Sequence, residues 1–139
     1  MLLILDSNEY IFALGTICDP VCEKLVKTIL KHPEKISVRI ARLIIEEIRA
    51  NLTAEAFKEF ILLTTSLTKI DEDTDIPFEL GAKYEAMGLK PADALIAAYV
   101  EWTGADVLAS ENRHFLSRQA SLPFKVLNAE RCLKFIKSL

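Results

Sequence analysis

An acidic residue interrupts an apolar helix face in the segment KPADALIAAYVEW, residues 90–102. At helical spacing Asp93 shares this face with Ile96, Ala97 and Val100, three residues that favour a dry interior. An acid near a helix N-terminus is also favoured by the helix dipole, so Asp93 has a purely structural explanation. The functional explanation is that the interior at this position is not dry and holds a polar site.

Helical geometry divides the acidic doublet Glu46-Glu47 between two environments. Glu46 has Arg42 four residues before it and Arg49 three residues after it, a spacing that predicts ion pairs on a solvated face. Glu47 follows Leu43 by four residues and falls on the apolar face. Because a buried, unpaired carboxylate is destabilising, Glu47 either reaches water at the border of that face or serves a site.

A third acid, Asp6, ends the apolar run LLILD at residues 2–6, which is typical of a buried strand. On its own, Asp6 is equally well explained as a helix N-cap or as a site residue at the strand end. Together, Asp6, Glu47 and Asp93 predict a cluster of carboxylates, which repel one another unless a cation lies between them. Mg²⁺ and Mn²⁺ prefer oxygen ligands. Such a site suits phosphodiester hydrolysis, because the cation polarises a phosphoryl oxygen and lowers the pKa of a bound water.

The elements that must position these acids alternate between apolar strands and amphipathic helices. Strands are predicted at residues 2–6, 35–40, 67–70, 106–110 and 124–127. Helices are predicted at residues 7–15, 20–32, 41–52, 53–67, 75–88, 90–104 and 129–139. This alternation predicts an α/β fold with helices flanking a central, mostly parallel sheet. Ligands of such sheets sit beyond the carboxyl ends of the strands, where Asp6 and the segment SENRHF (110–115) are expected.

Composition narrows the class of protein. A chain of 139 residues with 51% hydrophobic residues predicts one folded domain over residues 1–139. No apolar run approaches the roughly 20 residues needed to cross a bilayer, so we expect a soluble, cytoplasmic protein without membrane association. The three cysteines, Cys18, Cys22 and Cys132, include no CxxC pair and favour free thiols over disulfides or a cysteine zinc site. The net charge of −3 means that a polyanionic substrate would need local cations or metal ions.

The chain resembles the PIN-domain family and, within it, the VapC-type toxin ribonucleases. The resemblance runs over nearly the whole chain through the segments LLILDSNEYI, LIIEEIRANL and GLKPADALIAAYVEWTGADVLASENRHF, followed by a final strand and helix. The third segment is the most specific. Its DA dipeptide opens a helix, and a strand ending in a hydroxyl residue and an Asn-containing turn follows about a dozen residues later.

Carried over residue by residue, the family's acids fall on Asp6, Glu47 and Asp93, and its Thr or Ser near the site falls on Ser110. The resemblance implies a PIN-like fold and an endoribonuclease that uses Mg²⁺ or Mn²⁺, held by those three acids. It also implies an RNA substrate, restraint by a small antitoxin protein, and a homodimer.

The fourth family position departs from the pattern, because Asn112 stands where many relatives have Asp. Asn keeps a carbonyl oxygen but removes a charge, so the departure leaves open a second function. In that alternative the chain is a catalytically weak PIN-fold module that binds RNA or a protein without cleavage. We take Asn112 as the site residue, and we expect Glu111 on the surface and His114 in a turn near the rim.

Two unrelated classes of acid-site α/β proteins fit less well. A receiver domain has paired acids after its first strand, where this chain has the single acid of DSN (6–8). A phosphatase of the haloacid dehalogenase type has a second acid two residues after its nucleophile, where Asn8 stands.

Overall fold

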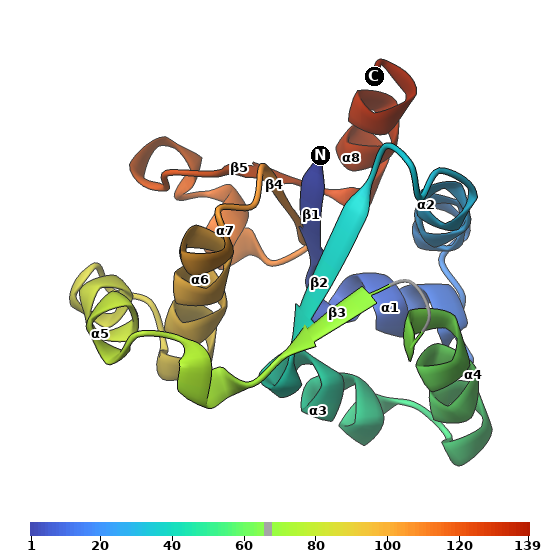
Figure 1. Ribbon diagram of the computed structural model, residues 1–139, viewed down its shortest axis with the longest axis horizontal. Helices are drawn as coiled ribbons and strands as arrows, with labels where there is room; N and C mark the ends of the chain where they lie inside the picture. The colour runs from blue at the N-terminus through green and yellow to red at the C-terminus, as the bar shows by residue number, and fades with distance from the viewer. Residues whose placement is uncertain (66–67) are drawn as a thin grey trace.

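A five-stranded, all-parallel sheet forms the centre of the computed structural model, with strand order β3-β2-β1-β4-β5 (Figure 1). The structure describes residues 1–65 and 68–139. The strands are β1 (Leu2–Leu5), β2 (Ser37–Ala41), β3 (Thr68–Asp71), β4 (Val107–Ala109) and β5 (Lys125–Leu127). The α/β fold with a parallel sheet that the sequence predicts is therefore confirmed.

Helices make up the connections between the strands. The α-helices of the described residues are α1 (Ser7–Leu14), α2 (Pro20–Lys31), α3 (Arg42–Asn51), α4 (Ala54–Thr65), α5 (Phe78–Ala86), α6 (Pro91–Thr103), α7 (Arg113–Leu116) and α8 (Ala129–Lys137). Two short 3₁₀ turns, η1 (Asp73–Asp75) and η2 (Gln119–Ser121), lie between them.

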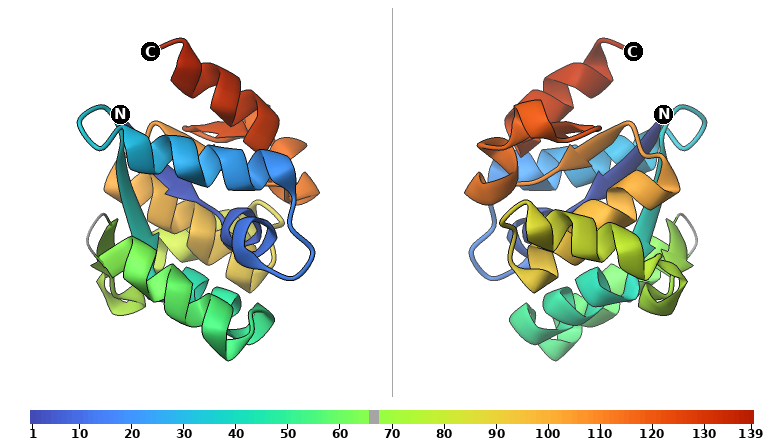
Figure 2. Two further views of the ribbon diagram at one scale, coloured as in Figure 1. Left: turned by 90° about the vertical axis from the view of Figure 1, so that its right-hand side faces the viewer. Right: turned by 90° about the vertical axis from the view of Figure 1, so that its left-hand side faces the viewer.

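The two faces of the sheet are covered by different helices. Figure 2 shows α2 and α4 in front of the sheet in one view and α5 and α6 in front of it in the opposite view. The central strands are buried from both sides, and Leu3, Ile4 and Leu108 have no exposed surface. This double burial explains why the strands read as continuous apolar runs instead of alternating patterns.

The order of the strands creates a switch point beside β1. From β1 the chain builds outward through β2 to β3, and it then returns to place β4 and β5 on the other side of β1. The connections after β1 and β4 therefore leave the sheet in different directions. The crevice between the carboxyl ends of these two strands is where ligands of open α/β sheets bind.

Local sequence signals set the ends of the helices next to this crevice. Asp6 caps α1 with its side chain, which accepts a hydrogen bond from the Ser7 backbone N–H. Pro91 occupies the first turn of α6, where its missing N–H costs nothing, and Gly104 ends that helix in the left-handed conformation at φ 71°.

Several predicted boundaries move by a few residues. The strand expected at 35–40 begins at Ser37, because the backbone N–H groups of Lys35 and Ile36 turn back to the carbonyl of His32. The helix expected at 75–88 begins at Phe78, since Pro77 holds Ile76 in an extended conformation. Residues 66–67, which fall in the predicted helix 53–67 and the predicted strand 67–70, lie outside the described residues. Helix α7 and the 3₁₀ turns were not predicted.

A partly buried ion pair ties β2 and β3 to α6. Arg39 of β2 donates two hydrogen bonds, of 2.8 and 2.9 Å, to the carboxylate of Asp71 at the end of β3. The Tyr99 hydroxyl of α6 donates a third, of 2.7 Å, and the Arg39 guanidinium lies 5.6 Å from the ring centroid of Trp102. These contacts connect α6, the helix that carries Asp93, to the edge of the sheet. No helix in the described part of the chain has the length and apolar character needed to cross a membrane.

Candidate active site

A polar depression of about 350 Å³ opens at the carboxyl ends of β1 and β4. It is lined by residues from α1, α3, α6 and the segment after β4, namely Asp6, Ser7, Asn8, Ile11, Phe12, Glu47, Asn51, Asp93, Ile96 and Asn112. Three of these side chains are carboxylates, and none of the described residues that line the depression is basic. The depression therefore concentrates negative charge at the switch point of the sheet.

Asp6 is the most deeply placed of the three acids, with only 4% of its surface exposed. Its Oδ1 accepts a hydrogen bond of 2.8 Å from the Ser7 backbone N–H, and its Oδ2 accepts one of 2.7 Å from the Ser110 hydroxyl. Asp6 is thus a helix N-cap, which is one of the two explanations offered by the sequence, and its side chain also lines the depression. The two hydrogen bonds fix the orientation of its carboxylate.

Glu47 reaches the depression from α3 and is held there by Ser7. The Ser7 hydroxyl donates a hydrogen bond of 2.7 Å to Oε2 of Glu47. Glu46, the other member of the doublet, points to solvent. Its predicted pairing with Arg42 is wrong, because Arg42 pairs instead with Glu72 across an N–O distance of 2.8 Å. Glu72 follows β3 directly, and the sequence pattern of α3 contains no information about that neighbour.

Asp93 and Asn112 meet across the depression from α6 and the loop after β4. The Asn112 side-chain amide donates a hydrogen bond of 3.1 Å to Oδ1 of Asp93. The Asn112 side-chain oxygen Oδ1 accepts a hydrogen bond of 2.9 Å from the backbone N–H of His114, which makes Asn112 the N-cap of α7. Asp93 is half-buried, while Ile96, Ala97 and Val100 on the same helix are buried, so the acid does stand on a buried face.

Ser110 joins the two halves of the depression. It has no exposed surface, and its hydroxyl donates to Asp6 while accepting a hydrogen bond of 3.0 Å from the backbone N–H of Asn112. The Ser110 side chain therefore connects Asp6, at the end of β1, to Asn112, in the segment that follows β4.

The burial of Asp6 and the charges of its two acidic neighbours act on its carboxyl group. Burial raises the pKa of Asp6 above its usual range, and the charges of Glu47 and Asp93 raise it further. The hydrogen bonds from Ser110 and Ser7 act in the opposite direction. A cation between the carboxylates would remove this repulsion, so the electrostatics of the depression fit a bound metal ion.

The spacing of the acids indicates which kind of cation fits. In the described residues, the one trio of His, Cys, Asp or Glu side chains whose ligand atoms all lie within 4.8 Å of one another is Glu9, Cys22 and Glu111. Asp6, Glu47 and Asp93 stand further apart than that. Mg²⁺ and Mn²⁺ are commonly held by one or two carboxylates and keep several of their waters, which suits the wider spacing and the all-oxygen donor set.

Glu111 was predicted to lie on the surface, and this prediction is wrong. It is half-buried, and its Oε1 accepts a hydrogen bond of 2.8 Å from the backbone N–H of Ala129 at the start of α8. The prediction failed because the contact partner of Glu111 comes from an element 18 residues later in the chain. His114 is exposed and lies in α7, next to the rim.

Sequence reasoning missed Ser7, which orients both Asp6 and Glu47. Its position directly after a strand-ending acid and at the start of a helix is the signal that could have identified it. It also missed Asn8 and Asn51 as lining residues, because neither stands out by residue type.

Comparison with solved structures assigns the fold. The chain is similar to a structure of VapBC2 from Rickettsia felis bound to a promoter DNA fragment, at 19% sequence identity and a TM-score of 0.62. The match covers 92% of this chain and 98% of the other. It is also similar to FitAcB from Neisseria gonorrhoeae, at 16% sequence identity and a TM-score of 0.61, with the same coverage of both chains. Mycobacterium tuberculosis VapC20, a sarcin-ricin loop cleaving toxin, matches at 13% sequence identity and a TM-score of 0.60. This match covers 86% of this chain and 95% of VapC20.

The comparisons with protein-family models and with curated proteins find no match. At these low identities the solved structures establish the arrangement of the backbone. The resemblance seen in the sequence segments is confirmed at that level, and the chain has a PIN-domain fold of the VapC-like type.

Proposed function

We propose that this protein is a metal-dependent endoribonuclease and that Asp6, Glu47 and Asp93 bind its Mg²⁺ or Mn²⁺. The single observation that carries the proposal is the convergence of three carboxylates, unaccompanied by any basic lining residue, in the depression at the switch point of the sheet. The support from comparison is the shared fold with VapC20, a toxin that cleaves the sarcin-ricin loop.

The residues of the depression have separate tasks in this mechanism. Asp6 and Glu47 are oriented before the substrate arrives, because Ser7 and Ser110 hold their oxygens. Asp93 is held by Asn112, and together they form the opposite wall. When bound, the cation supplies charge neutralisation, polarisation of a phosphoryl oxygen, and a water of lowered pKa.

A test of this function compares wild-type protein with Asp6→Asn on a panel of structured RNAs that includes a sarcin-ricin loop hairpin. We expect cleavage by the wild type with Mg²⁺ or Mn²⁺, no cleavage in excess chelator, and a loss of activity of at least about a hundredfold in the variant. Asp75→Asn makes the same chemical change at an exposed position outside the depression and should stay fully active. Full activity in Asp6→Asn or in chelator would refute the mechanism.

One observation favours the second candidate function, that of a binding module without cleavage. Asn112 contributes an amide where a fourth acid would strengthen cation binding, and that amide is already engaged with Asp93. In this case RNA or a protein partner binds, but no product appears at any metal concentration. Measuring RNA binding by fluorescence anisotropy alongside cleavage separates the two functions.

We further propose that the protein is the toxin of a toxin–antitoxin pair, acts in the cytoplasm, and forms a homodimer. The likeness to the VapBC2 and FitAcB structures supports a protein partner. Large apolar side chains that remain exposed provide surface for one, including Ile17, Leu62 and Phe78 at 88%, 71% and 83% exposure. Co-purification with the product of a short, adjacent gene encoding a DNA-binding protein, followed by light scattering on each species, tests the partner and the dimer.

A further inference from the structure

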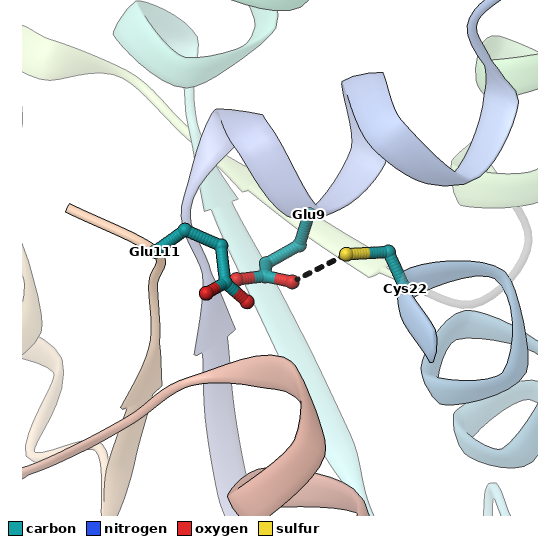
Figure 3. Close-up of side chains that lie close together, drawn as sticks. All are labelled: Glu9, Cys22 and Glu111. Carbon is teal, nitrogen blue, oxygen red and sulfur yellow. Dashed lines mark hydrogen bonds between the residues drawn. The ribbon is translucent and has the colours of Figure 1, made fainter. Parts of the chain in front are cut away.

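A second group of potential ligands lies outside the depression. Glu9 of α1, Cys22 of α2 and Glu111 of the loop after β4 bring one ligand atom each to within 4.8 Å of the others. Figure 3 shows the Glu9 carboxylate between the Cys22 sulfur and the Glu111 carboxylate. None of the three lines the candidate active site.

Glu9 is the unusual member of this group, because it has no exposed surface and one of its oxygens has no partner. Its Oε2 accepts a hydrogen bond of 3.3 Å from the Cys22 thiol. Its Oε1 is the one buried side-chain oxygen or nitrogen in the described chain without a hydrogen bond. An unpaired, buried carboxylate oxygen is strongly destabilising, and it faces the acid Glu111 (Figure 3). Among the residues that the structure describes, no salt bridge reaches Glu9.

One of the ligand–ligand distances already matches a coordination shell, and the others lie within 4.8 Å. Ligand atoms around a tetrahedral cation, with bonds of about 2.0 Å to oxygen and 2.3 Å to sulfur, stand about 3.3 to 3.5 Å apart. The Cys22 sulfur and Oε2 of Glu9 are already 3.3 Å apart. The Glu111 ligand atom lies within 4.8 Å of both, so binding requires it to move closer to them.

We propose that Glu9, Cys22 and Glu111 form a structural site for a borderline divalent cation of the Zn²⁺ class. A thiolate with two carboxylates is a donor set that Zn²⁺ accepts, and a thiolate is a poor ligand for Mg²⁺. The site therefore differs in metal preference from the all-oxygen depression. Binding releases the thiol proton of Cys22, and any proton shared by the two carboxyl groups, to the solvent.

The electrostatics of the metal-free cluster agree with this assignment. Burial, followed by the charge of Glu111, raises the pKa of Glu9 to about 8. Burial and the nearby Glu9 also raise the pKa of the Cys22 thiol. The field of the cluster extends to Cys132 of α8, whose pKa is raised to about 12 by burial and by Glu9. The Glu9 carboxyl and the Cys22 thiol, which are proposed ligands, would each ionise more readily beside a cation.

An occupied site would link segments that position the depression. Glu9 lies one turn after Asp6, and Glu111 stands between Ser110 and Asn112. Glu111 also holds the start of α8 through its bond to the backbone of Ala129. A cation on these ligands would fix α1, α2 and the loop after β4 relative to one another without touching the substrate.

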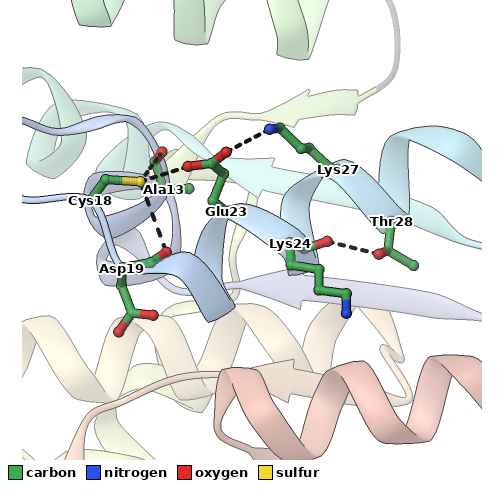
Figure 4. Close-up of polar contacts among 7 residues, drawn as sticks. All are labelled: Ala13, Cys18, Asp19, Glu23, Lys24, Lys27 and Thr28. Carbon is green, nitrogen blue, oxygen red and sulfur yellow. Dashed lines mark hydrogen bonds and ion pairs between the residues drawn. The ribbon is translucent and has the colours of Figure 1, made fainter.

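Cobalt provides the first test, because a thiolate bound to Co²⁺ gives a charge-transfer absorption that carboxylate ligands do not. We expect chelator-stripped protein to bind one Co²⁺ with this absorption and Zn²⁺ to displace it. Cys22→Ser should lose the absorption. The matched control is Cys18→Ser, because Cys18 is exposed and its thiol donates to Glu23 instead (Figure 4). An absorption that survives Cys22→Ser, or one lost only in Cys132→Ser, would refute the ligand set.

A second test uses the near-isosteric variant Glu9→Gln, which removes the buried charge and should fold. We expect its Zn²⁺ affinity to fall by at least about tenfold, and excess Zn²⁺ to raise its melting temperature much less than that of the wild type. Asp6→Asn should keep the Co²⁺ absorption and the Zn²⁺ stabilisation, which separates this site from the proposed nuclease site. If the wild type neither binds Zn²⁺ nor gains stability from it, Glu9 and Glu111 share a proton instead and the proposal is wrong.

Discussion

The side-chain amide of Asn112 donates a hydrogen bond of 3.1 Å to Asp93, across the depression between α6 and the loop after β4. This contact explains why an acid stands on a buried helix face: the buried face ends at the wall of a polar depression, and the acid has a donor there. The same contact makes position 112 a sensitive test of the site, because Asn and Asp differ there by a donor and a charge.

The first prediction concerns Asn112→Asp. An Asp at this position still caps α7, but its second oxygen faces Asp93 as an acceptor instead of donating to it. We expect the metal-free protein to lose about 1–3 kcal/mol of stability through the lost bond and the added repulsion. We expect Mn²⁺ affinity to rise, because a fourth carboxylate joins the depression. Calorimetric titration with Mn²⁺, and thermal melts with and without it, measure both effects.

Asn128→Asp is the control for this prediction. Asn128 caps α8 by accepting a hydrogen bond of 2.9 Å from the backbone of Arg131, and it does not line the depression. The control should leave Mn²⁺ affinity unchanged. If Asn112→Asp leaves both metal affinity and metal-free stability unchanged, Asn112 does not act in the depression.

The second prediction uses the neighbouring acids of α3. Glu47→Gln removes a carboxylate that Ser7 holds in the depression, so RNA cleavage should fall by at least about a hundredfold. Glu46→Gln makes the same change on the solvent side and should alter cleavage less than about twofold, as expected for an exposed residue without a site contact. Single-turnover cleavage rates at saturating Mg²⁺ compare the two. The opposite order of effects would mean that the wrong face of α3 has been assigned to the site.

The third prediction concerns the buried hydroxyl of Ser110. Ser110→Ala removes a donor from Asp6 and an acceptor from the Asn112 backbone, and it leaves both groups with one partner fewer. We expect a loss of about 1–3 kcal/mol in the free energy of unfolding and weaker Mn²⁺ binding, because Asp6 is no longer held. Urea unfolding and Mn²⁺ titration measure these changes. Ser117→Ala, at an exposed position, should change neither.

The fourth prediction is a dependence of stability on pH that comes from Asp71. Burial alone would raise the pKa of Asp71, but the hydrogen bonds from Arg39 and Tyr99 hold it below its ordinary value of 3.8. Because the folded pKa is the lower one, the unfolded chain binds more protons in this range and stability rises with pH. The contribution is complete above the unfolded pKa, and it is lost as pH falls through the folded pKa, below 3.8.

Asp71→Asn tests this dependence. We expect it to lower the free energy of unfolding at neutral pH by about 3 kcal/mol, because Arg39 is left partly buried without its partner. The difference between wild type and variant should shrink as the pH falls below about 4. Tyr99→Phe, which removes one of the three donors, should give a smaller change of the same sign. Urea unfolding at a series of pH values measures the difference, and a constant difference at all pH values would contradict the assignment.

Elements of this fold could be predicted from the sequence because their signals are local. A strand buried on both faces must be apolar throughout, as in LLIL, and a helix in contact with the sheet must repeat its apolar residues at helical spacing. The division of Glu46 from Glu47 follows from the same periodicity and needs no neighbour. The short helix α7 could not be predicted in this way, because four residues contain too little periodicity.

Relationships between distant segments were decided only by the tertiary structure. The sequence places acids at Asp6, Glu47 and Asp93, but the strand order is what brings the ends of β1 and β4 together. Neither the Ser110–Asp6 hydrogen bond nor the Glu9–Cys22–Glu111 group is visible in any local pattern, since their members lie up to 104 residues apart. Periodicity determines which face of an element is buried, whereas the identity of the neighbour on that face depends on the packing of the whole chain.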